Sequence, residues 1–198
     1  MILATAPLLD ASSSSQAVSW VLGATALLMV ANIVRMTPVL NAVGFVFVAA
    51  SIVFSLLSVW QFPVLTPWSH LLESAAYFYA AAGMVLYMLK DHVVSTDDLF
   101  AAGAGFTLLA WSFAYLYAAC QFWVPGSFTA AVNAQMPRTF LELIFLSFTS
   151  LSSTGLGDVV PISSPARVIS AIQMFTGVMY MALIVSRLVG MKGSKDQR

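Results

Sequence analysis

Apolar residues occur along this chain in long runs rather than at the spacing of a single buried face. Five runs are long enough to cross a membrane as helices, which takes about 20 residues each. They lie at residues 17–35, 39–60, 68–89, 99–124 and 165–189. A sixth run, residues 140–151, is too short to span and has a length typical of re-entrant segments. The pattern predicts an all-α membrane protein with five transmembrane helices and one re-entrant helix.

Composition supports this fold class and narrows the function. Charged residues make up 8% of the chain and hydrophobic residues 60%, whereas soluble domains carry about 25% charge. The formal net charge of zero argues against a nucleic-acid partner. One cysteine, Cys120, and two histidines cannot build a zinc site. With no nucleotide-binding loop either, we expect neither an enzyme nor a resident cofactor.

The distribution of Lys and Arg predicts how the chain is oriented in the membrane. With the C-terminus in the cytoplasm, every basic residue except Arg138 and Arg167 lies on the cytoplasmic side, as the positive-inside rule requires. Five spans then place the N-terminus outside. We expect residues 1–16 to form an exterior leader and residues 192–198 a short cytoplasmic tail.

The first three predicted helices, within residues 17–94, lack the repeated basic residues of a voltage sensor. Residues 75–83 are rich in Ala and Gly and suit close helix packing. His70 and Glu73 lie about one turn apart. They can form a pH-sensing pair or a locally satisfied interface pair, and we favour the interface pair.

Residues 149–158 form a polar segment, rich in hydroxyl groups, within this apolar chain. It contains Gly155 and Gly157 and follows the short apolar run. Its backbone groups would be unsatisfied in bare lipid, so the segment must be buried in protein or line a water-filled path. Carbonyl and hydroxyl oxygens can replace the water shell of a monovalent cation. The segment is therefore predicted to be an ion filter.

The sequence S-T-G-L-G-D at residues 153–158 resembles the T-V-G-Y-G-D signature of tetrameric potassium channels. The resemblance covers roughly residues 95–192, with the pore module at residues 95–191. It is greatest to small bacterial channels and so implies a location in the inner membrane of a bacterium. It implies a pore module of outer helix, pore helix, filter and inner helix, assembled as a homotetramer around a central pore, with membrane lipids and monovalent cations as its other partners. It also implies that permeant K⁺ is bound by a filter made of Ser153, Thr154, Gly155, Leu156 and Gly157.

Three filter positions depart from the family signature. Ser153 stands for Thr, Thr154 for Val, and Leu156 for a Tyr that normally hydrogen-bonds to aromatic residues of the pore helix. The positions expected to face Leu156 are Phe145 and Leu146, so the support around the filter is predicted to be apolar packing. Three functions remain open: a potassium-selective channel, a weakly selective cation channel, and a non-conducting membrane subunit that retains the pore fold.

The residues on either side of the filter have expected roles. Thr139 and Glu142 form a T-x-x-E capping box for the pore helix, after an exterior turret, residues 125–138, that we expect to be a solvated loop. Asp158 lies where four copies would place an acidic ring at the outer mouth, and it can also serve as a turn residue.

The inner helix is predicted to begin with Ser164 as N-cap and Pro165 as its first residue. Gly177 lies near its middle, either as a gating hinge or as a small residue that permits close helix packing. Four apolar residues recur at helical spacing after it and line the inner vestibule or pack on the outer helix: Val178, Met181, Val185 and Val189.

Overall fold

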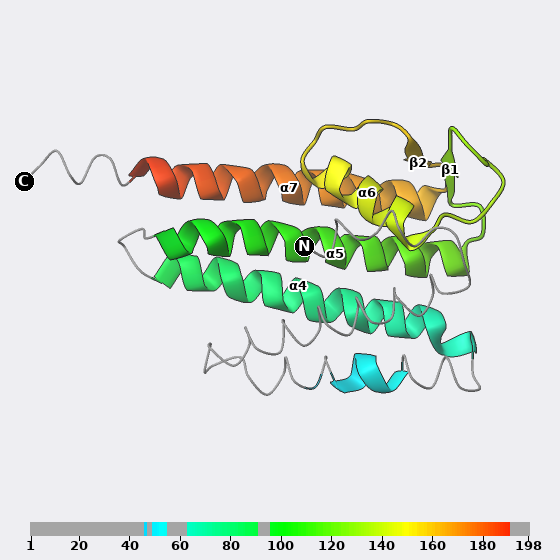
Figure 1. Cartoon of the computed structure of the whole chain (residues 1–198), viewed down its shortest axis with the longest axis horizontal. Coiled ribbons are helices and arrows are strands. Elements are labelled where there is room, and N and C mark those ends of the chain that lie inside the picture. Colours follow the sequence, from blue (N-terminus) through cyan, green and yellow to red (C-terminus); the bar gives the residue numbers. More distant parts are fainter. Residues whose placement is uncertain (1–45, 47–48, 55–62, 91–95, 191–198) are drawn as a thin grey trace, which may run out of the picture.

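A computed structural model describes residues 46, 49–54, 63–90 and 96–190 of the chain (Figure 1). Its named elements are, in order, η2 (Pro63–Leu65), α4 (Thr66–Lys90), α5 (Thr96–Trp123), β1 (Phe128–Ala130), α6 (Phe140–Leu151), β2 (Val159–Pro161) and α7 (Ser164–Gly190). The expected leader, the tail, the span at residues 17–35 and most of the span at residues 39–60 lie outside the described residues.

Three helices in the described part of the chain are long and apolar enough to cross a membrane: Thr66–Leu89, Asp98–Trp123 and Ser164–Arg187. They correspond to the three runs predicted at residues 68–89, 99–124 and 165–189. Helix α6 is the short apolar helix, and its bounds are those of the predicted run. The described chain is thus mostly helical, as expected.

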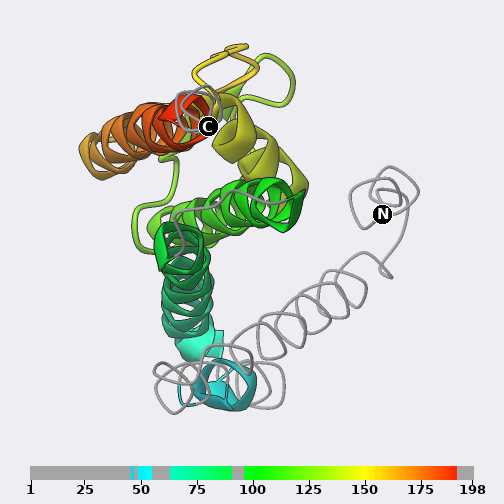
Figure 2. The same ribbon diagram turned by 90° about the vertical axis from the view of Figure 1, so that its left-hand side faces the viewer.

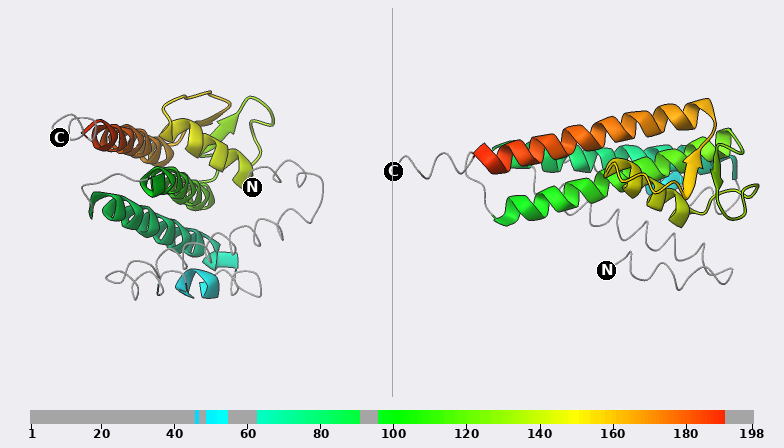
Figure 3. Two further views of the ribbon diagram at one scale, coloured as in Figure 1. Left: turned by 60° about the vertical axis from the view of Figure 1, so that its left-hand side comes forward. Right: turned by 90° about the horizontal axis from the view of Figure 1, so that it is seen from above.

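Helix α5 lies between α4 on one side and α6 and α7 on the other (Figure 2). Helices α4 and α7 both start at the end of the bundle where α5 stops, and the two strands lie at this same end (Figure 3). We call it the strand end. There, the Trp68 and Trp123 rings meet edge to face, with their centroids 5.5 Å apart. At the opposite end, Asp98 of α5 forms an ion pair with Arg187 of α7 over 3.6 Å.

The α4–α5 interface combines small residues with stacked aromatic rings. Ala76, Ala80 and Ala81 of α4 are buried, which confirms the small-residue packing face predicted there. The Tyr77 ring stacks on the Tyr115 ring of α5 at 5.6 Å. The predicted contact between His70 and Glu73 is also present, with His70 Nδ1 3.1 Å from Glu73 Oε2.

A two-stranded antiparallel sheet joins the turret to the segment that follows Gly157, and the all-helical prediction missed it. Phe128 pairs with Pro161, and Ala130 pairs with Val159. Phe128 and Val159 are buried in one cluster with Leu143 of α6. The turret, expected to be a solvated loop, is thus partly ordered by pairing. Strands of three residues are too short to give a periodic sequence signal.

Candidate functional site

Helix α6 begins with the predicted capping box. The Glu142 backbone N–H donates to Thr139 Oγ1 at 3.3 Å, and the Thr139 N–H donates to Glu142 Oε2 at 2.6 Å. Two backbone donors that the first turn leaves free are thereby satisfied. The capping role predicted for Thr139 and Glu142 is confirmed.

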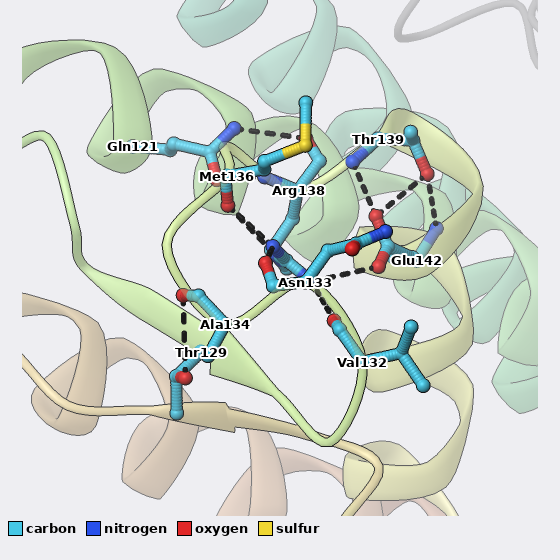
Figure 4. A network of polar contacts seen from close by, with 9 residues as sticks. All are labelled: Gln121, Thr129, Val132, Asn133, Ala134, Met136, Arg138, Thr139 and Glu142. Carbon is cyan, nitrogen blue, oxygen red and sulfur yellow. Dashed lines mark hydrogen bonds and ion pairs between the residues drawn. The ribbon is translucent and has the colours of Figure 1, made fainter.

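The same carboxylate is paired with Arg138, for which the sequence predicted only a position on the exterior side (Figure 4). The Arg138 side chain is buried, and its Nη1 lies 3.0 Å from Glu142 Oε1. Its backbone N–H donates to Gln121 Oε1 of α5 at 2.7 Å, while its carbonyl accepts from Gln121 Nε2 at 2.9 Å. The guanidinium also donates to three turret carbonyls, those of Val132, Asn133 and Met136. Arg138 thus ties the turret, the start of α6 and the end of α5 together.

Helix α6 runs from the strand end to the middle of the bundle. Its first residue, Phe140, lies against the Tyr115 ring, with centroids 4.7 Å apart. Its last residue, Leu151, lies against Gly177, halfway along α7: a Cβ placed on residue 177 would be 2.0 Å from the Leu151 carbonyl oxygen. The close-packing alternative for Gly177 is therefore confirmed. The gating hinge stays a prediction.

After Leu151 the chain reverses, and residues 152–158 return to β2 at the strand end as an exposed segment (Figure 1). Every second residue in it has a positive φ: Ser153 at 58°, Gly155 at 56° and Gly157 at 73°. When the sign of φ alternates in this way, successive backbone N–H groups turn to one side. The carbonyls consequently turn to the other side, which is the arrangement a row of cation ligands needs.

The N–H side of this segment faces the end of α6. The Thr149 carbonyl accepts from the N–H of Thr154 at 2.9 Å and from the N–H of Gly155 at 3.2 Å. The Thr154 hydroxyl reaches the same carbonyl at 3.2 Å. These donors, with the Ser152 hydroxyl at 3.3 Å, satisfy a carbonyl at the end of the helix. The two amides also fix which side of the segment faces inward.

The two glycines are required by their backbone conformation, not by crowding. Nothing lies within 4 Å of a Cβ built on Gly155 or Gly157, yet both have φ values that residues with a Cβ avoid. The Leu156 side chain is 68% exposed. Leu146, expected to face Leu156, is instead buried in the cluster of Leu143 and Val159. The predicted apolar support for Leu156 therefore does not form around Leu146 within one chain.

Asp158 is exposed next to the strands. Its carbonyl accepts from the Ala131 N–H at 3.2 Å, which extends the strand pairing by one bond. Helix α7 starts a few residues later, but its cap differs from the prediction: Ser163 Oγ, and not Ser164, accepts from the Ala166 N–H at 3.3 Å. Pro165 is accordingly the second residue of α7.

Helix α7 turns one narrow stripe toward the rest of the chain. The predicted vestibule residues Val178, Met181 and Val185 lie off this stripe and are all more than half exposed. Within the single chain these three side chains do not pack on α5, and the vestibule and the packing on an outer helix both stay predictions. The Val189 side chain lies outside the described part. The inward stripe of α7 consists of Ala166, Ser170, Gln173, Gly177 and Tyr180.

Comparison with known protein families identifies the family to which this arrangement of helices belongs. A family model described as "Ion channel" matches residues 74–191, from the first half of α4 to the end of α7. Neither the curated proteins nor the solved structures give a match. The family match covers more than half of the chain, and the chain therefore belongs to the two-transmembrane ion channels that carry the potassium-channel pore.

Proposed function

We propose that this membrane protein is a passive cation channel, selective for potassium, whose pore is formed by four copies of the chain. In this proposal α5 is the outer helix, α6 a re-entrant pore helix and α7 the inner helix. Residues 153–157 of each copy supply one side of the filter. A single segment offers only one row of carbonyls, whereas an ion must be surrounded, so closed symmetry around the pore completes the site.

The alternating φ values at residues 153, 155 and 157 carry this proposal. In addition, the N–H groups of Thr154 and Gly155 are bonded to the Thr149 carbonyl. The N–H side of the segment therefore faces α6, and the carbonyl side is exposed. Exposed carbonyls cannot face lipid without partners. Permeant K⁺ at Ser153, Thr154, Gly155 and Leu156 would provide them. The exposed Asp158 then stands at the outer mouth, where its carboxylate attracts cations.

The placement in the membrane follows the same reasoning. We propose that the strand end faces outward and the Arg187 end faces the cytoplasm of a bacterium. The tryptophan pair Trp68 and Trp123 at the strand end suits a membrane interface. A cysteine placed at the exposed Val132 should react with an impermeant thiol reagent on intact cells. The native Cys120 is buried and should not contribute to this labelling. Labelling only after the cells are opened would reverse this orientation.

Flux from liposomes that contain the purified protein tests the function. We expect K⁺ efflux from the unaltered protein and little efflux from Gly157→Ala, in which a methyl group opposes the positive φ. Gly157 is a suitable site because the added Cβ meets no atom within 4 Å, so the fold should survive. A well-folded oligomer without flux would point to the non-conducting membrane subunit.

A second candidate is a weakly selective channel for monovalent cations. It is favoured by Leu156, whose exposed side chain lacks the hydroxyl that the family signature places there. Parallel measurements of Na⁺ and K⁺ efflux distinguish the two channels. Equal rates would favour weak selectivity, and much faster K⁺ efflux would favour the potassium channel.

A further inference from the structure

A fully buried glutamine, Gln173, lies on the inward stripe of α7. Its neighbours Ile172 and Met174 are exposed, so the amide is enclosed on a helix whose surface is otherwise largely open within the chain. A buried amide in a membrane helix is unfavourable unless its donors and acceptor are bonded. The partners of Gln173 therefore indicate what the residue does.

The amide of Gln173 connects three helices at one point. Its Nε2 donates to the Ser147 carbonyl at 2.9 Å and to Ser147 Oγ at 2.6 Å, both on α6. Its Oε1 accepts from the Tyr117 hydroxyl of α5 at 2.5 Å. Ser147 Oγ in turn donates to the Ala110 carbonyl of α5 at 2.6 Å. Ser147, Tyr117 and Gln173 are all fully buried, so water does not compete for these bonds.

This connection lies directly behind the candidate filter. Ser147 lies two residues before Thr149. The Thr149 carbonyl accepts hydrogen bonds from the backbone N–H groups of Thr154 and Gly155. One turn further along α7, Gly177 closes against Leu151. The two contacts, at Gln173 and Gly177, fix how deep α6 lies and how it is rotated. A shift of α6 at Ser147 would therefore move the Thr149 carbonyl and the segment bonded to it.

We propose that Gln173 is a positioning residue for ion selectivity. It supports the filter through hydrogen bonds to α6, a support that Leu156, which has no hydroxyl, cannot give from within the filter. The proposal rests on the function proposed above. Gln173 does not touch the permeating ion: it acts through Ser147 and Thr149. The role needs an amide, because donors must reach α6 while an acceptor receives the Tyr117 hydroxyl.

Three variants test the proposal by the ratio of potassium to sodium permeability. Gln173→Met keeps the length of the side chain and removes its donors, and we expect the ratio to fall about tenfold, equivalent to about 1.4 kcal/mol. Tyr117→Phe removes the bond to Gln173 Oε1, together with the hydroxyl's interactions with Ser170 and Ser150, and leaves the two bonds to Ser147. Its ratio should therefore fall less. Thr176→Val is the matched control, because the Thr176 hydroxyl donates to Ile172 within its own helix, and its ratio should not change.

The permeability ratio separates positioning from general support. A residue that only stabilises the fold would reduce the amount of channel without changing the ratio for the channels that remain. An unchanged ratio in Gln173→Met would overturn the proposal. If that variant fails to assemble, an unchanged ratio in a stable Tyr117→Phe would overturn it equally.

Amide hydrogen exchange in the membrane-reconstituted protein gives a second readout that does not depend on conduction. Loss of the Gln173 amide should speed exchange at the Thr154 and Gly155 amides, and Thr176→Val should not. Unchanged exchange in Gln173→Met would refute the positioning role even if the unaltered protein conducts. Absence of flux from the unaltered protein would instead refute the proposed function, and the exchange data would still decide the role of Gln173.

Discussion

Helices α5 and α7 both qualify as membrane spans, but they differ in how much of their surface the chain itself covers. In its most apolar stretch, α5 is 56% buried inside the chain, whereas α7 is 22% buried. Helix α5 is enclosed because it contacts α4, α6 and α7. Among the described residues, helix α7 contacts the rest of the chain through a single stripe, and its other apolar faces are left open there.

Because of this difference, substitutions on the two helices should have different effects. Changes on α5, or on the inward stripe of α7, should alter the stability of the single chain. Changes on the outward faces of α7 should leave that stability nearly intact and act on assembly or conduction. The candidate filter follows the second pattern, because residues 152–158 are exposed within the chain.

The largest effect is expected at Gly177, where the two helices α6 and α7 meet most closely. In Gly177→Ala the added methyl group would lie 2.0 Å from the Leu151 carbonyl oxygen, and backbone atoms cannot move aside as a flexible side chain can. Overpacking of this kind costs typically 1–3 kcal/mol, occasionally more. Thermal unfolding in detergent should show a clearly lowered midpoint.

Gly103→Ala on α5 is the control for this prediction, since nothing lies within 4 Å of a Cβ built there. Alanine favours a helix over glycine by about 1 kcal/mol, so this variant should be at least as stable as the unaltered protein. Equal stability of the two variants would show that α6 and α7 do not pack closely at Gly177.

A somewhat smaller loss of stability is expected when the bonds of Arg138, which join the turret to α5 and α6, are removed. Arg138→Gln removes the buried guanidinium and with it the bonds to Glu142 and to three turret carbonyls. A lost partner of a buried polar group costs about 1–3 kcal/mol. Glu142→Gln should cost less, because its amide can still accept the Thr139 N–H. Thermal unfolding should rank them in this order, and the reverse ranking would contradict this role of Arg138.

The outward face of α7 should respond very little in stability. Val178→Ala shortens an exposed side chain, and such surface changes usually stay within about 0.5 kcal/mol. Crosslinking of the reconstituted oligomer and single-channel conductance are the sensitive measurements for this face. A large drop in the stability of the single chain would mean that Val178 packs inside its own subunit.

The smallest effect is expected at the outer mouth. Asp158→Asn removes one negative charge per chain from an exposed position, and exposed charges are screened over about 8 Å at physiological ionic strength. Conductance should fall at low salt and recover at high salt. A decrease that does not depend on salt would indicate that the Asp158 side chain shapes the turn rather than the local cation concentration.

The sequence predicted those features that depend on neighbouring residues. Helix α6 begins and ends where the apolar run does, and the T-x-x-E motif at Thr139 formed the expected capping box. The resemblance at residues 153–158 led to the family, and the family match covers this segment. Glycine stands at residues 155 and 157, where φ is positive, the region that residues with a Cβ avoid.

The features that were missed depend on residues far apart in the chain. Tyr117 and Gln173 are separated by 56 positions, and Ser147 and Gln173 by 26. Polar residues inside apolar runs were the available signal, but the sequence did not specify their partners. Arg138 is likewise bonded through its backbone to Gln121 of α5, a contact that a count of charges on each side of the membrane does not reveal.

The potassium filter is best tested by the reversal potential of the purified protein, with equal concentrations of K⁺ on one side of a bilayer and Na⁺ on the other. For a monovalent ion each tenfold in the permeability ratio shifts this potential by about 59 mV. We predict a shift of more than this amount, negative on the potassium side, that falls toward zero in Gly157→Ala. A potential near zero for the unaltered protein, or an unchanged shift in Gly157→Ala, would contradict the assignment of residues 153–157 as a potassium filter.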